Sequence, residues 1–371
     1  MKKSLGLYLH VPFCVQKCRY CDFCSVAGSS ADKISEYCRA LAARARELAA
    51  RCEGYCVDTV YFGGGTPSLM DIRDVERLMS VISAEYDVDK NAEITLECNP
   101  ATADLDYFRA LSSLGINRIS MGLQSALDGE LALLGRIHTA KEFSKTFDDA
   151  RRAGFDNISA DLMYGIPDQT MESFRRSIDY LVAHAPEHIS AYALSVEEGT
   201  YFHKHRVELS LADDDAQSDM YLECVSRLSE GGYERYEISN FARDGKYSRH
   251  NTRYWQRLDY LGLGVAAHSC FLGERFGNSR DIDAFLRGED ITEERVALTP
   301  EDERAEHIML GLRLALGIDT EEYFVRFGER IEALPSVKKY IDGGFMRLAD
   351  GRLAFEDKGF LVSNSILADI I

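Results

Sequence analysis

Short apolar runs and amphipathic stretches alternate through the first two-thirds of the chain. Apolar runs typical of buried strands fall at residues 5–10, 58–62, 93–98, 118–122, 157–163 and 188–194. Stretches with helical periodicity follow them at residues 33–51, 71–84, 104–114, 141–153, 171–183 and 213–230. This alternation predicts right-handed βαβ units and an α/β fold with a parallel sheet. Six units are too few for an eight-fold barrel, so the pattern alone leaves open a partial barrel or a doubly wound sheet.

The pattern changes after residue 232. Residues 233–240 predict a strand or a turn, and residues 250–269 are aromatic and interrupted by glycines. Two helical stretches and a hairpin around Asp350-Gly351 follow at residues 300–315, 320–327 and 343–355. We therefore expect three parts, namely a core, a connecting segment and a small helical, winged-helix-like domain. Their predicted bounds are residues 1–232, 233–298 and 299–371.

Composition narrows the class of protein. The 371 residues include 61 acidic and 43 basic ones, which gives a net charge of −18. Non-specific nucleic-acid binding depends on Lys and Arg, so we expect no nucleic-acid partner. No apolar run approaches the ~18 residues of a membrane helix, and the N-terminus lacks the long apolar segment of a signal peptide. We expect a cytoplasmic protein, whose ten cysteines indicate thiol, metal or redox chemistry.

Four of the cysteines lie close together, directly after the first predicted strand. Their spacing is Cys14-x3-Cys18-x2-Cys21-x2-Cys24. Three thiolates on one short loop can hold three corners of an iron–sulfur cubane. Tetrahedral zinc, which favours paired CxxC elements, and unligated thiols are the alternatives. A ferredoxin-type cluster would take a fourth cysteine from elsewhere, and Cys98 is the candidate.

The cysteine spacing resembles the signature of radical S-adenosylmethionine (radical SAM) proteins. The flanking letters, YLHVPFC at residues 8–14 and CRYCDF at residues 18–23, are similar to the branch that contains oxygen-independent coproporphyrinogen III oxidase. The resemblance covers nearly the whole chain and implies a partial (β/α)6 barrel. It also implies S-adenosylmethionine as a co-ligand of a [4Fe–4S] cluster that is bound by Cys14, Cys18 and Cys21.

Several glycines and polar residues fall near the predicted carboxyl ends of strands, where the active site of either fold lies. Residues 63–66, Gly-Gly-Gly-Thr, follow the second strand but lack the ending of a phosphate-binding loop. Taken singly, each of these residues is equally well explained by a structural role. Arg136 suits a carboxylate, because its guanidinium fork binds bidentately. The resemblance implies that the cofactor contacts Tyr8, Tyr20, Gly64, Gly65, Thr66, Glu97, Gln124, Arg136, Asp161 and Ala193.

His10 and Cys24 flank the cysteine motif. His10 ends the first predicted strand, where it is a candidate proton donor or substrate contact. The alternative for His10 is a hydrogen bond that supports the cysteine loop. Cys24 stands three positions after Cys21, whereas the oxidase branch carries Cys-x-Cys. We therefore expect Cys24 to be a neighbour of the cluster and not a ligand.

Residues 250–255, His-Asn-Thr-Arg-Tyr-Trp, resemble the haem-binding motif of the HemW group of haem chaperones. Imidazole ligates haem iron, and aromatic rings stack on a porphyrin. The alternative is an aromatic core cluster with a hydrogen-bonded histidine. The motif string of this chain starts at Tyr8, whereas the oxidase has a substantial extension before it. The resemblance implies haem binding by His250, Asn251, Tyr254 and Trp255.

Three functional hypotheses follow. The leading one is a radical SAM-type haem chaperone that binds haem as cargo and delivers it to respiratory haem proteins. It would use a reductant such as a flavodoxin or ferredoxin, and would meet membranes only through its partners. The first alternative is the oxidase itself, which decarboxylates coproporphyrinogen III through a 5′-deoxyadenosyl radical. The second is a non-catalytic metal-binding module, which would be indifferent to S-adenosylmethionine.

Overall fold

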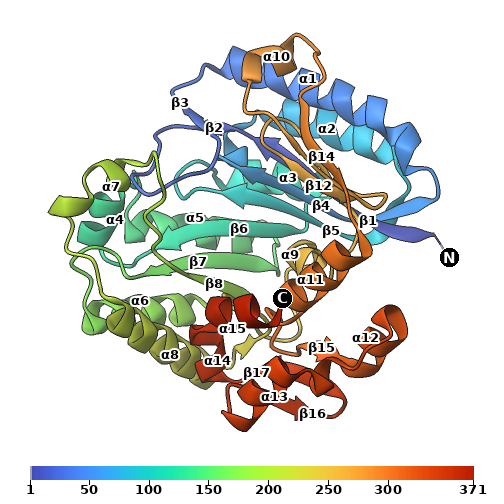
Figure 1. Cartoon of the computed structure of the whole chain (residues 1–371). Helices are drawn as coiled ribbons and strands as arrows, with labels where there is room; N and C mark the ends of the chain where they lie inside the picture. The colour runs from blue at the N-terminus through green and yellow to red at the C-terminus, as the bar shows by residue number, and fades with distance from the viewer. Residues whose placement is uncertain (1) are drawn as a thin grey trace.

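A sheet of twelve strands runs through the computed structural model, which describes residues 2–371. Six consecutive strands of this sheet are parallel neighbours (Figure 1). They are β1 (Lys3–Val11), β4 (Tyr55–Gly64), β5 (Val88–Cys98), β6 (Arg118–Gln124), β7 (Ile158–Tyr164) and β8 (His188–Ala193). All six predicted strands are therefore present. The sheet has two free edges, so the six βα units form a partial barrel.

Long helices follow the parallel strands and pack on the outside of the sheet. They are α1 (Ala31–Ala49), α2 (Ile72–Glu85), α3 (Leu105–Ser113), α5 (Ala140–Arg152), α6 (Met171–His184) and α8 (Asp214–Glu230). Figure 1 shows α1 and α2 beside one end of the sheet and α6 and α8 beside the other. Each helix begins after a Ser, Asp or Thr whose side chain accepts a backbone N–H of the first turn. Helices cover the outer face of the sheet, and polar side chains fill its inner face. As a result, all seven residues of the middle strand β6 are buried.

The sheet continues beyond β1 and beyond β8. Beyond β1, β11 (Tyr260–Leu263) runs parallel to it, and β12 (His268–Phe271), β13 (Glu274–Asn278) and β14 (Thr292–Ala297) follow as antiparallel strands. Beyond β8, the short strands β10 (Asn240–Ala242) and β9 (Glu234–Arg235) are also antiparallel. The helices α9 (Arg249–Trp255) and α10 (Ile282–Leu286) belong to the same region. Residues 233–298 thus add strands to both edges of the core sheet.

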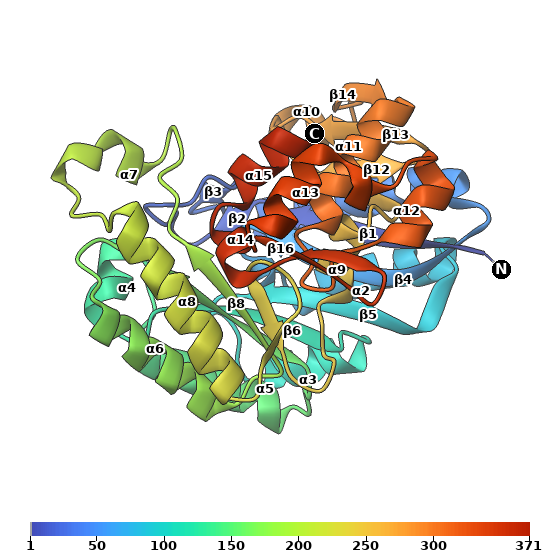
Figure 2. The same ribbon diagram turned by 60° about the horizontal axis from the view of Figure 1, so that its bottom comes forward.

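The last part of the chain is small and mixed. Its three-stranded sheet contains β15 (Ile318–Asp319), β16 (Met346–Ala349) and β17 (Arg352–Phe355). Its helices are α11 (Pro300–Gly311), α12 (Thr320–Phe327), α13 (Pro335–Asp342), α14 (Asp357–Leu361) and α15 (Ser363–Ile370). The predicted hairpin turn is present, since Asp350 and Gly351 both have positive φ. α11 ends earlier than predicted, and Leu314 beyond it forms an isolated bridge with Glu237. Figure 2 shows the C-terminal helices α11 to α15 gathered together on one side of the core.

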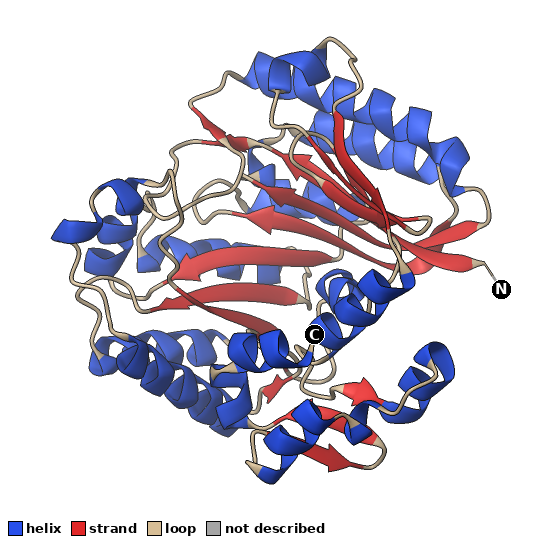
Figure 3. Ribbon diagram, in the orientation of Figure 1, coloured by secondary structure: helices blue, strands red, loops and turns tan. Residues whose placement is uncertain are grey.

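The connecting loops gather at the arrowhead ends of the parallel strands (Figure 3). The remaining short elements are β2 (Phe13–Cys14), β3 (Val26–Ala27), α4 (Asp128–Leu134) and α7 (Tyr201–Lys204), with 3-10 turns at Ala50–Cys52, Pro67–Leu69, Arg206–Glu208 and Ile331–Ala333. β2 and β3 pair with each other and bracket the cysteine motif. Within residues 2–371, no helix combines the length and the apolar character that crossing a membrane requires.

Candidate functional site

A polar cavity lies at the carboxyl ends of the parallel strands, below the cysteine loop. Its lining comes from β4, β5, β6 and β7 and from the loops that follow them. Eleven of the predicted site residues line it, namely Cys14, Cys18, Cys21, Tyr20, Gly64, Gly65, Thr66, Glu97, Gln124, Arg136 and Asp161. The structure therefore gathers side chains from six separate stretches of sequence at one place. Tyr8 and Ala193 are not among the lining residues.

The three cysteines of the predicted ligand set face this cavity as free, half-buried thiols. Within residues 2–371, no three His, Cys, Asp or Glu side chains are gathered closely enough to hold one metal ion. Tetrahedral zinc would need its sulfur ligands within roughly 4 Å of one another. A cubane places each thiolate on a different iron, so it accepts more widely spaced sulfurs. The donor set therefore fits an iron–sulfur cluster better than a single zinc ion.

A chain of hydrogen bonds joins Cys14 to Cys18 across the cavity floor. The Thr66 hydroxyl donates to Cys14 Sγ at 3.5 Å and accepts from Asn99 Nδ2 at 2.8 Å. Asn99 Oδ1 accepts from the Arg136 guanidinium at 2.8 Å, and a second nitrogen of that guanidinium lies 3.6 Å from Cys18 Sγ. Positive charge and donors beside thiolates stabilise the charged form. This arrangement suits sulfur ligands that carry negative charge.

Glu97 is the carboxylate at the end of β5. It accepts hydrogen bonds from the Tyr61 hydroxyl at 2.8 Å and from the Gly64 N–H at 3.0 Å. Burial raises the pKa of Glu97 to about 7, although both hydrogen bonds oppose the shift. A cation beside this carboxylate would favour its charged form. The amino group of an amino acid would supply one.

Arg136 and Asp161 place opposite charges elsewhere in the cavity. Burial raises the pKa of Asp161 to about 6. Arg136 donates to the Gly122 carbonyl at 2.9 Å, and its Nε is buried with no hydrogen-bond partner among residues 2–371. Gln124 stands at the end of β6 with a φ of 71°, next to a shift in the β6–β7 register. A ligand with both a carboxylate and hydroxyl groups would find partners here.

Residues 64 and 65 must be glycine for close packing under the cysteine loop. Gly64 has a φ of 116°, and a β-carbon there would lie 2.7 Å from the His10 ring. A β-carbon at Gly65 would lie 2.7 Å from the Phe13 carbonyl oxygen. The close approach lets the backbone of this turn line the cavity. The glycines thus bring the end of β4 against the cysteine loop.

A second cavity, of about 690 Å³, lies on the other side of the cysteine loop. Tyr8 and His10 line it, together with Cys24, whereas Phe23 lines both cavities. His10 Nε2 donates to the Cys24 carbonyl at 2.9 Å, and His10 Nδ1 accepts from the Tyr8 hydroxyl at 3.1 Å. Burial lowers the pKa of His10. His10 supports the loop through this bond, and its proposed role as a proton donor stays a prediction.

The predicted haem motif forms α9, which is held against β1 and β4. His250 is 1% exposed, and its two ring nitrogens lie 2.8 Å from the Thr59 and Tyr254 hydroxyls. Its ring stacks on Tyr61, with 5.1 Å between the centroids. Burial lowers the pKa of His250 to about 3. In this arrangement neither nitrogen is free to ligate iron, so haem ligation by His250 stays a prediction.

The other motif residues are more accessible. Tyr254 is half-buried and lines the second cavity. Asn251 and Trp255 are also half-buried, but neither lines that cavity. The Trp255 indole nitrogen is buried without a hydrogen-bond partner among the described residues. Of the four motif residues, only Tyr254 thus faces a space that a large ligand could fill.

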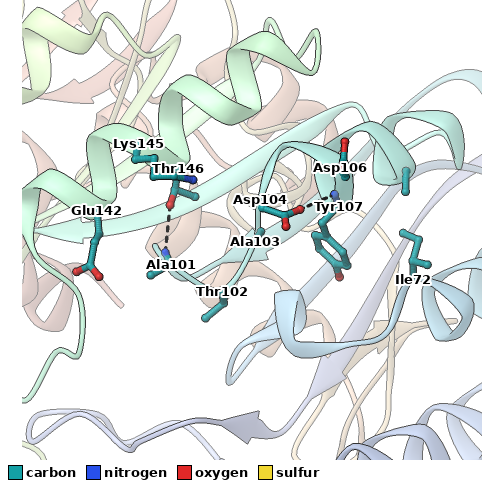
Figure 4. A pocket seen from close by; sticks show the side chains of 11 residues that line it. Ile72, Ala101, Thr102, Ala103, Asp104, Asp106, Tyr107, Glu142, Lys145 and Thr146 are labelled. Atoms are coloured by element: carbon teal, nitrogen blue, oxygen red, sulfur yellow. Dashed lines mark hydrogen bonds between the residues drawn. The ribbon is translucent and has the colours of Figure 1, made fainter.

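Another hollow, of about 680 Å³, lies on the helical side of the molecule (Figure 4). Its polar groups have structural partners. Asp104 caps α3 by accepting the Tyr107 N–H, and the Thr146 hydroxyl accepts the Ala101 N–H. None of the predicted site residues lines it. We assign no chemistry to this hollow.

Sequence reasoning missed several residues that line the first cavity. Asn99 links the two halves of the hydrogen-bond chain, and Ser120 also lines the cavity. Cys98, which the sequence offered as a fourth cysteine ligand, lines it too. The position of Asn99 was a usable signal, because Asn99 stands two residues after Glu97. Cys98 is 3% exposed, and burial raises its pKa to about 11. For Cys98 to act as a fourth thiolate ligand, metal binding would have to offset the free-energy cost of ionising this buried thiol.

Two family models match this chain. The model of the radical SAM superfamily matches residues 8–181, and the model of the HemN C-terminal domain matches residues 298–362. The solved structure of coproporphyrinogen III oxidase (HemN) from Escherichia coli has the same fold. It superimposes with a TM-score of 0.87 at 23% identity, over 100% of this chain and 90% of that one. Fold and cysteine motif thus define the class as radical SAM proteins with a HemN-type C-terminal domain.

Curated relatives are similar over most of their length. The haem chaperone HemW of Lactococcus lactis is 31% identical over 99% of this chain and 97% of its own. The haem chaperone HemW of Haemophilus influenzae is 36% identical over 86% of this chain and 85% of its own. The mitochondrial radical S-adenosyl methionine domain-containing protein 1 of Bos taurus is 32% identical over 99% of this chain and 87% of its own. The chain therefore belongs to the HemW family of radical SAM proteins.

Proposed function

We propose that this chain is a cytoplasmic haem chaperone, which binds haem, delivers it to haem-dependent respiratory proteins and meets membranes only through those partners. The observation that carries the proposal is its identity of 31–36% to proteins named haem chaperone HemW. The cavity of about 690 Å³ beside the predicted haem motif supports it, since ligand sites commonly measure ~300–1,000 Å³. With a net charge of −18, nucleic acid is not an expected partner.

The proposal assigns the first cavity to the resident cofactors. Cys14, Cys18 and Cys21 would hold a [4Fe–4S] cluster, and S-adenosylmethionine would occupy the space between Glu97 and Arg136. Glu97 and the glycine turn at Gly64 and Gly65 would bind its amino group and Arg136 its carboxylate, while Gln124 and Asp161 would lie beside the rest of the molecule. A cluster held there supplies one-electron chemistry to bound S-adenosylmethionine, given a reductant such as a flavodoxin or ferredoxin. The chain's own part is to orient the cofactor and to exclude water from the cysteine loop.

Haem handover tests the proposal. Membranes from haem-starved bacteria contain respiratory enzyme without haem, so their oxygen consumption reports haem delivery. Haem-loaded protein is expected to restore oxygen consumption faster than the same concentration of free haem. Protein without haem serves as the control. Restoration no faster than with free haem would contradict a chaperone function.

A further inference from the structure

The second cavity offers the surroundings that a planar metal chelate needs. It lies between the cysteine loop, the end of β1 and the antiparallel strands β12 to β14. Three tyrosines line it, namely Tyr8, Tyr254 and Tyr260. Phe23, two positions after Cys21, adds an aromatic ring that is 68% exposed. Aromatic faces of this kind bind a large flat ligand.

His268 has the accessible imidazole of this cavity. It begins β12 and is exposed, and its ring makes no hydrogen bond to another residue within 2–371. Its ring lies over Gly277, the residue opposite it on β13. A β-carbon at Gly277 would come within 3.0 Å of Nδ1 and Cε1 of that ring. The missing side chain at Gly277 therefore makes room for the imidazole.

The other two imidazoles near the cavity are already engaged. His10 donates to the Cys24 carbonyl and accepts from Tyr8. His250 is held between the Thr59 and Tyr254 hydroxyls and does not line the cavity. A neutral imidazole needs one nitrogen with a free lone pair to ligate iron. Among the histidines of this region, His268 meets that condition.

The charged groups of the cavity include one cation. Arg280 is exposed, and its positive charge reaches both His10 and Cys24. Within the described chain it forms no ion pair, so its guanidinium is available to a ligand carboxylate. Asp22, Glu293 and Glu294 also line the cavity and would repel such a carboxylate. A ligand with acidic groups on one edge would thus turn that edge toward Arg280.

Glu293 has a further consequence for His268. It stands opposite Gly277 on β14, while His268 stands opposite Gly277 on β12. Cross-strand neighbours share a face of the sheet, so a carboxylate lies one strand beyond the glycine that carries the ring. Metal-bound histidines commonly give their second N–H to such an acceptor. The three strands thus place an imidazole and a carboxylate on the same face of the sheet, on either side of Gly277.

We propose that the second cavity is the haem site of this chain, with His268 as an axial ligand of the iron and Arg280 as the partner of a propionate. The inference rests on the proposed function, since it names where and how that cargo binds. Tyr254 forms part of the wall, and His250 holds the Tyr254 hydroxyl in place. The haem motif thus shapes the site, and its histidine is not the ligand. The cargo would lie beside the cysteine loop.

The test is haem binding by the full chain with its cluster reconstituted without oxygen. Soret difference spectra and resonance Raman spectra would be recorded for wild type, His268→Ala, His268→Tyr, His250→Ala and Arg280→Gln. His203→Ala is the matched control, because His203 is exposed and lies outside the cavity. His268→Ala should lose the histidine-ligated spectrum and bind roughly tenfold or more weakly. His268→Tyr should show the spectrum of a tyrosine-ligated haem.

The remaining variants separate the two proposals. The His250→Ala protein should bind haem more weakly but keep histidine ligation of the iron. The Arg280→Gln protein should also bind haem more weakly, with no change of axial ligand. The His203→Ala protein should match wild type. Wild-type ligation and affinity in both His268 variants would overturn the inference while leaving haem binding intact. The inference would also be overturned if His250→Ala, and neither His268 variant, lost histidine ligation of the haem iron. Failure of the wild type to bind haem at a defined stoichiometry would overturn the proposed function.

Discussion

At the scale of the residue, Glu97 links the fold to the cofactor. It lies between the Tyr61 hydroxyl and the Gly64 N–H, and burial raises its pKa to about 7. Without a bound cation, the folded chain therefore holds this proton more tightly than the unfolded chain does. The contribution of Glu97 to stability is full below its ordinary pKa of 4.5 and declines as the pH rises toward 7.

Glu97→Gln should remove this pH dependence. Relative to wild type, the cofactor-free variant should gain stability between pH 5 and pH 8, by of the order of 1 kcal/mol because water in the cavity screens the charge. Urea unfolding of both proteins at several pH values measures the difference. Buried histidines such as His250 titrate in both proteins, so they cancel in the comparison. A stability difference that is constant with pH would contradict the burial of this carboxyl.

The sequence was a better guide to residue types than to their contacts. Strand ends and the family resemblance pointed to Glu97, Arg136 and Asp161, and these do line one cavity. Asn99 escaped notice because an amide carries no chemical signature until Thr66 and Arg136 are seen on either side of it. Such pairings depend on the parallel register of neighbouring strands, which composition and spacing do not determine.

At the scale of the element, α9 is the connection between the haem motif and the core. Arg253 in this helix is 2% exposed and forms an ion pair with Asp58 on β4. It also donates to the Asp259 carbonyl at 2.9 Å, next to β11. One buried cation therefore fixes the helix both to β4 and to the start of β11, which lie on either side of β1. Ser248 begins the helix by accepting the Asn251 N–H.

Arg253→Ala should destabilise the protein by about 2–3 kcal/mol, because it removes the buried partner of Asp58 and leaves that carboxylate only the exposed and more distant Arg249. Arg249→Ala is the matched control in the same helix. Arg249 is exposed and its guanidinium lies 3.8 Å from Asp58, so its loss should cost less than ~0.5 kcal/mol. Denaturant midpoints for the two variants provide the measurement. Equal losses would show that α9 is not anchored in this way.

The haem motif shows the limit of pattern reasoning at this scale. The letters at residues 250–255 predicted haem binding, but no helix was expected there. In a helix, positions 250 and 254 lie one turn apart on the same side, so the His250 ring meets the Tyr254 hydroxyl at 2.8 Å. That local pairing directs the histidine into the core and the tyrosine toward the second cavity. Recognising the Ser248 cap would have revealed this geometry.

At the scale of the whole molecule, hydrophobic alternation predicted the six βα units and the C-terminal hairpin correctly. It did not predict that residues 260–297 would extend the sheet beside β1, on the opposite edge from β8. Pairing of β1 with β11 joins residues about 250 positions apart, and such long-range pairings leave no local trace. The second cavity is made by this extension. Its existence could therefore not be predicted from the sequence.

The central claim is that this radical SAM fold serves haem as cargo and does not decarboxylate a porphyrin precursor. One anaerobic preparation with reconstituted cluster tests it most directly. Haem is titrated while the Soret band and the fluorescence of Trp255, the one tryptophan of the chain, are recorded. The same sample is then given coproporphyrinogen III, S-adenosylmethionine and a reductant. We predict saturable haem binding and no decarboxylation. Rapid decarboxylation without haem binding would contradict the account and make the protein an oxidase.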